Sequence, residues 1–228
     1  MYKEKMKAQL WFRSIVGIAA LIVFLFAAGG HLDYWQGWAY IGLNVFFLGL
    51  TNWVLRNEPS LRSERMAPGA GIKWWDKVYY IFSVPLYFIC LTVAGLDGGR
   101  YHWTPHVPLA LYLAVIIAYI LGQSLTLWAK TANRFFSSVV RIQLDRGQTV
   151  CAEGPYRYVR HPGYLGGLLF GLSAPLLLGS AVALIPAGLA ALSLLVRTLL
   201  EDNTLLAELD GYKQYANAVK FRLLPYIW

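Results

Sequence analysis

The sequence predicts an all-α, polytopic transmembrane helix bundle of about six spans. Three observations carry this prediction. The 228 residues are 57% hydrophobic and only 14% charged, whereas soluble domains carry about 25% charged residues. Several apolar runs approach the roughly 20 residues that a helix needs to cross a bilayer. The basic residues fall in the polar segments between these runs, as is typical of membrane proteins.

Four apolar runs make up the N-terminal part of the chain, at residues 14–29, 35–55, 78–96 and 107–129. We therefore predict an N-terminal domain of transmembrane helices over residues 1–129. The basic segment before the first run also resembles a signal peptide. Because the chain begins with methionine, we expect this first helix to be retained.

Aromatic residues gather where the second run begins. Such residues suit a belt at the membrane–water interface. The belt is predicted to consist of Tyr34, Trp35, Trp38 and Tyr40.

Residues 130–228 are predicted to form a second domain with a loop, a helical hairpin and a C-terminal helix. The loop spans residues 130–162, and two short apolar runs follow it, at 163–178 and 181–196. Sixteen helical residues reach only about 24 Å, less than the roughly 30 Å hydrocarbon core. The two runs either extend beyond these limits or form a hairpin that thins the bilayer. Four full spans plus a re-entrant pair is the alternative.

The distribution of basic residues predicts the orientation of the chain. With the N-terminus in the cytoplasm, all but one of the 20 lysines and arginines fall on the cytoplasmic side, and the exception is Arg100. The positive-inside rule therefore favours both termini and the 130–162 loop in the cytoplasm. The same bias explains the net charge of +8, so nucleic acid is not expected as a partner.

Neither the cysteines nor the histidines predict a metal site or a disulfide framework. Cys90 falls in an apolar run and Cys151 in a polar loop. The histidines are too scattered for zinc-ligand spacing: His31, His102, His106 and His161. The chain also has no glycine-rich dinucleotide or phosphate-binding motif.

The first polar cluster at a span end is residues 154–164, Gly-Pro-Tyr-Arg-Tyr-Val-Arg-His-Pro-Gly-Tyr. Gly154 and Pro155 predict a turn, and Pro162 favours an extended conformation at His161. The next span then starts with free N–H groups, which suit the carboxylate of an amino-acid-like ligand.

Part of this cluster has a simpler interpretation. Arg157, Tyr158 and Arg160 suit a basic, aromatic anchor at the membrane interface. That interpretation explains His161 and Pro162 poorly.

The second polar cluster begins at Arg197, and Glu201 lies four residues later on the same helix face. An ordinary salt bridge is the alternative to a functional pair. Helical spacing continues this face, as far as about Lys220, in a stripe that suits packing: Glu201, Leu205, Glu208, Tyr212, Tyr215 and Val219. In the hairpin before it, Gly167 and Gly171 match the small-xxx-small pattern for close helix packing.

Several motifs now occur in a recognisable order: the 154–164 cluster, Arg197-x-x-x-Glu201, Tyr212-x-x-Tyr215 and Arg222-Leu-Leu-Pro225. Together they resemble the isoprenylcysteine carboxyl methyltransferase family. The resemblance covers about residues 133–228, and the N-terminal spans agree only in hydropathy. It implies a membrane-embedded enzyme that takes S-adenosylmethionine as methyl donor, with a catalytic loop and C-terminal helix on the cytoplasmic face. We expect it in a prokaryotic inner membrane.

The resemblance also implies site residues. The donor-binding residues fall on Gln148, Thr149, Val150, Cys151, Tyr156, His161, Pro162, Gly163, Tyr164 and Glu201. Arg197 is expected to bind the substrate carboxylate, so Arg197 and Glu201 form the expected catalytic pair. Arg141 aligns less closely with another donor contact. Gln148 stands where relatives often have histidine, and Asp202 where they often have a second glutamate.

The expected reaction is O-methylation of a carboxylate on a lipid-like or prenylated substrate that enters from the bilayer. A carboxylate, with a pKa of about 4, is already ionised at neutral pH and needs no base. Methylation of a lipid amine is one alternative, and it requires a base such as His161, Glu201 or Asp202. A nicotinamide-dependent sterol-type reductase, with a similar Arg-His-Pro segment, is another, and a non-catalytic scaffold is the last.

Overall fold

The computed structural model describes residues 2–105 and 107–228, without the side chains of residues 2–11 and 13. Four of the basic residues counted for the orientation therefore have no described side chain, namely Lys3, Lys5, Lys7 and Arg13. His106 lies outside the described residues. Within the described residues the chain is all-helical and contains no strand, which confirms the predicted class.

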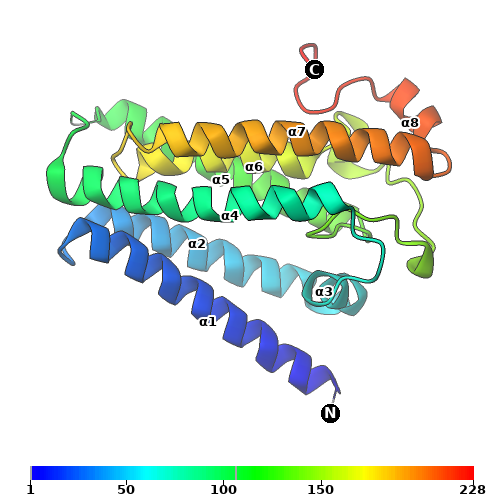
Figure 1. Cartoon of the computed structure of the whole chain (residues 1–228), viewed down its shortest axis with the longest axis horizontal. Helices are drawn as coiled ribbons and strands as arrows, with labels where there is room; N and C mark the ends of the chain where they lie inside the picture. Colours follow the sequence, from blue (N-terminus) through cyan, green and yellow to red (C-terminus); the bar gives the residue numbers. More distant parts are fainter. Residues whose placement is uncertain (1, 106) are drawn as a thin grey trace. The chain divides into compact units, whose positions relative to one another are not determined.

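Eight α-helices follow one another through the described residues (Figure 1). Their bounds are α1 Tyr2–Gly29, α2 Trp35–Val54, α3 Pro59–Met66, α4 Trp74–Ala94, α5 Leu109–Ala132, α6 Pro162–Leu177, α7 Leu184–Glu208 and α8 Tyr212–Ala218. A π-helical segment, Gly95–Tyr101, extends α4, and short 3₁₀ turns occupy Leu55–Asn57, Leu144–Arg146 and Gly154–Arg157.

Four helical segments are long and apolar enough to cross a membrane: Trp35–Asn57, Trp74–Tyr101, Leu109–Ala132 and Leu184–Glu208. Two shorter apolar helices accompany them, Ser14–Gly29 and Pro162–Leu177. The protein is therefore an integral membrane protein.

Helix α7 runs 12 residues further than the apolar pattern predicted, because it continues past Val196 to Glu208. This extension contains Arg197 and Asp202, both buried and both in ion pairs. Ion pairing offsets part of the free-energy cost of burying these charges. A helix end placed by hydropathy alone therefore came too early in the chain.

The chain forms two compact units. Unit 1 comprises residues 1–54, 84–119 and 171–190, and unit 2 comprises 55–83, 120–170 and 191–228. Helices α4 to α7 contribute to both units. The predicted boundary between residues 129 and 130 stays a prediction.

A buried carboxylate holds the loops of unit 1 together. Asp97 is fully buried and accepts hydrogen bonds from the Thr104 backbone N at 2.7 Å and from Oγ of Ser180 at 2.6 Å. It therefore ties the π-helical segment to the connection between α6 and α7.

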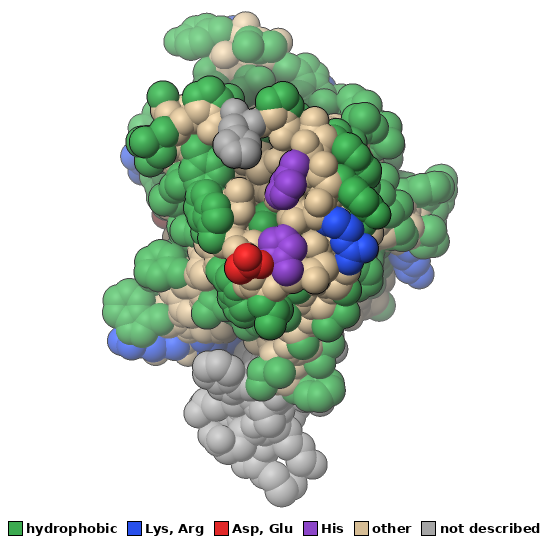
Figure 2. All heavy atoms as spheres, turned by 90° about the vertical axis from the view of Figure 1, so that its left-hand side faces the viewer, with side chains coloured by type: hydrophobic (Ala, Val, Ile, Leu, Met, Phe, Trp, Pro, Cys, Tyr) green, Lys and Arg blue, Asp and Glu red, His purple; other side chains and the backbone are tan. Residues whose placement is uncertain are grey.

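Figure 2 looks onto the end of unit 1 at which these loops lie, where hydrophobic side chains predominate and charges are few. Trp35 and Trp38 are exposed, as an interfacial belt requires. Tyr34 and Tyr40 were wrongly predicted to share this belt, since both are buried, and the Tyr34 hydroxyl donates to the Leu178 carbonyl. Tyrosine was misassigned because its hydroxyl can be satisfied inside a bundle as well as at an interface.

A close helix approach in unit 2 involves α5 and α6, at Gly122 and Gly166. A Cβ on Gly166 would lie 2.5 Å from the Gly122 carbonyl oxygen, so only glycine fits. The predicted pair behaves differently: a Cβ on Gly167 would meet Leu194 at 3.4 Å, and none of the described atoms lies within 4 Å of one on Gly171. The prediction of close packing at Gly171 was wrong, because spacing does not reveal which face meets a neighbour.

The predicted C-terminal helix is interrupted. Helix α7 ends at Glu208, Gly211 adopts a positive φ of 82°, and α8 restarts at Tyr212. The aromatic part of the predicted stripe still packs in one cluster, formed by Ala129, Tyr156, Leu209, Tyr212, Tyr215 and Ala216 with Leu205 and Val219 against it. Glu208 does not belong to that cluster, because it is exposed and pairs with Lys73 at 2.6 Å.

Candidate active site

Unit 2 contains a pocket of about 810 Å³, counting the part that is open to solvent. Its walls come from the 133–161 loop, the start of α6, the end of α7 and α8. The pocket is therefore built from segments that are far apart in the sequence.

The pocket brings together most of the predicted donor-binding residues. Those that line it are Gln148, Thr149, Val150, Cys151, Tyr156, His161, Gly163, Tyr164 and Glu201. Pro162 is not among the lining residues, and it forms the first residue of α6. Arg141 lines the pocket as well, whereas Arg197 does not.

The Gly154 turn forms as predicted, and local sterics explain it. Gly154 has a positive φ of 56°, and a Cβ there would lie 3.0 Å from Ala132 and 3.1 Å from Nε1 of Trp128. Pro155 follows at the start of a 3₁₀ turn, where its fixed φ suits the first position. The turn brings Tyr156 into the buried cluster.

The C-terminal tail pairs with the backbone of the motif. Arg160 N donates to the Phe221 carbonyl and His161 N to the Arg222 carbonyl, each at 2.9 Å. His161 is thus held outside the helix, as the following proline predicted, and α6 begins at the next residue.

Asp202 is the charged centre of this arrangement. It is fully buried, and its Oδ1 lies 3.1 Å from Nε2 of His161 and accepts from the Tyr212 hydroxyl at 2.8 Å. Its Oδ2 accepts from Nε of Arg222 at 2.8 Å and pairs with Nη2 of Arg160 at 3.1 Å. One carboxylate on α7 therefore fixes the motif, α8 and the tail.

The tyrosines of the site are neutral. Burial raises the pKa of Tyr156, Tyr212 and Tyr215 well above the usual value near 10. The Tyr215 hydroxyl donates to the Tyr156 carbonyl at 2.7 Å, which fastens α8 to the Gly154 turn.

The predicted Arg197–Glu201 pair is not an ion pair within 4 Å in the described part of the chain. Glu201 instead accepts from the Tyr164 hydroxyl, and the Tyr164 ring stacks on His161 with centroids 5.7 Å apart. Shared helix face alone therefore did not make the two residues partners.

Arg197 makes different contacts. Its Nε donates to Oδ1 of Asp76 and its Nη2 to the Ser138 carbonyl, both at 2.8 Å. Its Cζ also lies 5.3 Å from the ring centroid of Tyr164. Arg197 thus adjoins the pocket through that tyrosine.

Arg141 is held by two carboxylates. Its Nε and Nη2 donate to Glu64 at 2.8 and 2.7 Å, and its Nη1 donates to Asp145 at 2.7 Å. The hydrogen bonds that Arg141 donates to Glu64 lower the pKa of the Glu64 carboxyl and raise that of the Arg141 guanidinium. The guanidinium therefore braces the loop against α3.

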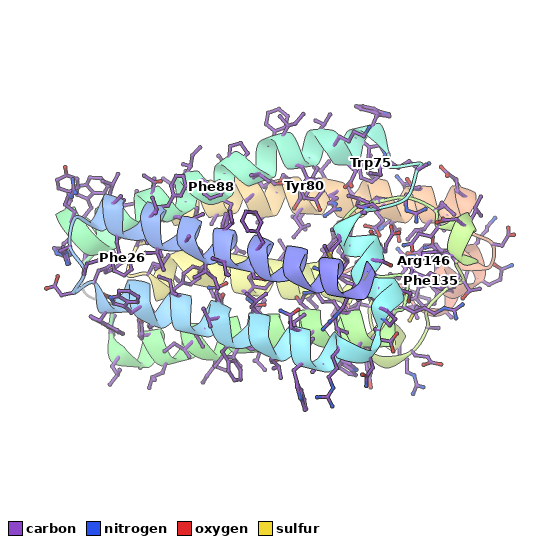
Figure 3. All side chains as sticks on the ribbon, turned by 90° about the horizontal axis from the view of Figure 1, so that it is seen from below. Phe26, Trp75, Tyr80, Phe88, Phe135 and Arg146 are labelled. Atoms are coloured by element: carbon purple, nitrogen blue, oxygen red, sulfur yellow. The ribbon has the colours of Figure 1, made fainter. Side chains whose placement is uncertain are left out.

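The 133–151 loop has further internal bonds. The Gln148 side-chain oxygen accepts from the Gln143 backbone N at 2.7 Å. The guanidinium of Arg146 lies over the Phe135 ring at 5.6 Å, and Figure 3 shows these two residues together. Gln148 thus has a structural role besides the ligand role that the resemblance implies.

Sequence reasoning missed several residues of this site. Glu64 and Asp76 supply the carboxylates for Arg141 and Arg197, yet no local pattern connects them to arginines 77 and 121 positions away. Arg160 was interpreted as a possible interface anchor, but it is buried, lines the pocket, and has an Nε without a hydrogen-bond partner among the described residues. The pairing of Arg160 with Asp202 became apparent only from the structure.

Comparison with known proteins bears directly on this pocket. A sequence model of the isoprenylcysteine carboxyl methyltransferase (ICMT) family matches residues 112–207. The resemblance to this family is confirmed. The matched stretch contains every predicted donor-binding residue as well as Arg197 and Asp202, and it ends before α8. Members of the ICMT family are methyltransferases that use S-adenosylmethionine.

One similar protein is the protein-S-isoprenylcysteine O-methyltransferase of Schizosaccharomyces pombe. It is 29% identical to this chain over 90 residues, a stretch that covers 39% of this chain and 38% of the relative. The similarity thus spans well under half of either protein, and it supports the resemblance to the ICMT family for the shared stretch.

Proposed function

We propose that this protein is an S-adenosylmethionine-dependent methyltransferase of the membrane, which O-methylates a carboxylate on a lipid-like or prenylated acceptor. The observation that carries the proposal is the pocket itself. Nine residues that the ICMT resemblance assigns to the donor come from four separate segments and line one cavity.

The pocket residues fit this donor. Val150, Leu205 and Leu209 offer apolar surface to an adenine, while Gln148 and Glu201 offer polar groups to a ribose and an amine. The unpartnered, buried Nε of Arg160 supplies a positive donor for the carboxylate of the methionine part. When bound, S-adenosylmethionine supplies a methyl group activated by a positively charged sulfur.

The residues around Glu201 would orient the acceptor. In this proposal Arg197, braced by Asp76, orients the acceptor carboxylate next to Tyr164. Glu201 and Tyr164 hold the donor at the same place. Alignment of two reactants can lower the barrier by roughly 7–11 kcal/mol. No general base is needed, because a carboxylate is already ionised at neutral pH.

We further propose six spans with both termini and the pocket in the cytoplasm. The basic residues of the 130–162 loop support this orientation, because lysine and arginine collect on the cytoplasmic side of membrane proteins and part of this loop lines the pocket. A prokaryotic inner membrane remains part of the proposal.

The test is methyl transfer from isotope-labelled S-adenosylmethionine to membrane lipids and small molecules of the host, read by mass spectrometry. Label recovered in base-labile esters supports the proposal. Label in amines, with a rate that rises as one ionisable group loses its proton, favours the amine alternative. Oxidation of NADPH without label transfer contradicts both.

A further inference from the structure

Arg65 is a half-buried cation that has no counter-ion among the described residues. It lies in the last turn of α3, and its Nη1 is buried with no hydrogen-bond partner among the described residues. None of the described carboxylates forms an ion pair with it. A charged donor that is buried and unpaired costs free energy, so the folded protein tolerates a defect here that a bound anion would remove.

A second cation lies near Arg65. Lys130, in the last turn of α5, is half-buried and close enough to Arg65 for the two charges to repel one another. Two carboxylates of unit 2 are already engaged, since Glu64, which precedes Arg65 in the chain, pairs with Arg141, and Asp76 pairs with Arg197. Two like charges in a partly desolvated place favour an anion between them.

The ring of Phe136 connects these cations to the pocket. Phe136 lines the pocket and lies against Gly163, where a Cβ would come within 2.6 Å of the ring. The guanidinium of Arg65 lies over the same ring, 5.9 Å from its centroid. Tyr80, labelled in Figure 3, is near both Arg65 and Arg197. Neither cation is among the residues that line the pocket, but Arg65 adjoins it through the ring of Phe136.

We propose that Arg65 and Lys130 form an oxyanion site that receives the carboxylate of the methyl acceptor. The assignment of the anion to the acceptor rests on the proposed function. Arg197 already donates Nε to Asp76 and Nη2 to the Ser138 carbonyl. Because Asp76 compensates its charge, Arg197 alone does not offset the cost of desolvating a second carboxylate. Arg65 and Lys130 supply that charge, and Arg197 orients the group for transfer.

A binding role and a structural role predict opposite effects of substitution. If the arginine serves the fold, Arg65→Gln lowers the melting temperature. If it serves an anion, Arg65→Gln raises the melting temperature of the ligand-free protein, because an unpaired charge and a like-charge repulsion both disappear. The same change then weakens binding of the anion.

The experiment measures binding to the full-length protein in neutral detergent micelles. The probes are decanoate, decyl phosphate, decyltrimethylammonium and inorganic phosphate, each with and without S-adenosylhomocysteine. The variants are Arg65→Gln and Lys130→Gln, with Arg134→Gln as the matched control, since Arg134 is exposed and also lies over a phenylalanine ring.

We expect decanoate to bind the wild-type protein and the Arg134→Gln variant alike, and to bind the other two variants about tenfold more weakly. Equal decanoate binding by all four proteins would overturn the proposal. Binding of decyl phosphate or inorganic phosphate without decanoate would overturn the assignment to an acceptor carboxylate. S-adenosylhomocysteine binding reports on the proposed function separately: its absence from the wild-type protein contradicts that function and leaves the decanoate result standing.

Discussion

The carboxylate of Asp202 on α7 lies 3.1 Å from the imidazole Nε2 of His161, 41 residues earlier in the chain, and both side chains are buried. The same carboxylate also binds Arg160, Tyr212 and Arg222. It therefore joins the 154–161 segment, α8 and the C-terminal tail at one side of the pocket. One charge thus contacts three separate chain segments.

Replacing Asp202 with asparagine should destabilise the protein strongly. The shape is kept, but Arg160 and Arg222 lose the charge that compensates them in a buried place. Breaking a buried pair in this way typically costs about 3–5 kcal/mol. The change should appear as a large drop in the unfolding free energy in detergent, together with loss of S-adenosylhomocysteine binding.

The matched control is Glu208→Gln, six residues later on the same helix. Glu208 pairs with Lys73, but the pair is exposed, and exposed pairs contribute about 0–1 kcal/mol. If the two variants unfold alike, Asp202 is not the centre of the site.

Tyr164→Phe should impair methyl transfer and leave the fold intact. The ring that stacks on His161 remains, but Glu201 loses the hydroxyl that it accepts from. Hydrogen bonds to charged groups contribute about 1.5–3 kcal/mol, which corresponds to roughly a 10- to 100-fold loss of kcat/KM. Tyr158→Phe serves as control because Tyr158 is exposed, and an equal loss in both variants would contradict the role of Tyr164.

Gly166→Ala should destabilise the packing of α5 against α6. The added Cβ would lie 2.5 Å from the Gly122 carbonyl oxygen, and overpacking of this kind costs about 1–3 kcal/mol. Gly171→Ala, on the same helix, has open space and should be neutral or stabilising by about 0.5–1 kcal/mol through helix propensity. Thermal unfolding of the two variants checks the pair, and a reversed order would show that the helices cross elsewhere.

The ion pair between Glu64 and Arg141 should make the unfolding free energy depend on pH in the acidic range. The hydrogen bonds from Arg141 lower the pKa of Glu64 below its usual value, which is about 4.3 in an unfolded chain. The carboxylate therefore stabilises the fold above about pH 4.3, and this contribution is lost as the pH falls through the folded pKa. Unfolding free energies of the wild-type protein and Glu64→Gln should converge below about pH 4.3, whereas a constant difference would contradict the pair.

The sequence predicted the helices and the donor segments better than the contacts between them. Periodicity and hydropathy located α2, α4 and α5, because apolar length is a local property. The Gly154 turn and the start of α6 followed from proline and glycine geometry, which is also local.

The partners of the charged residues were not predictable in this way. Arg197 lies one turn before Glu201, yet it pairs with Asp76 on α4. Asp202 was treated as a shortened glutamate, although it is the charge that organises the site. Such choices depend on which helices meet, and a single sequence carries no periodic signal for that.

The most direct test of a methyl-donor pocket uses Cys151. This thiol lines the pocket and is half-buried, and burial raises its pKa, so it should alkylate slowly at neutral pH. With Cys90, the other cysteine, replaced by serine, the rate of alkylation can be followed by mass spectrometry. The account predicts that S-adenosylhomocysteine slows alkylation of Cys151 at least about tenfold at saturation and that NADPH does not. Protection by NADPH, or equal rates with and without S-adenosylhomocysteine, would contradict it.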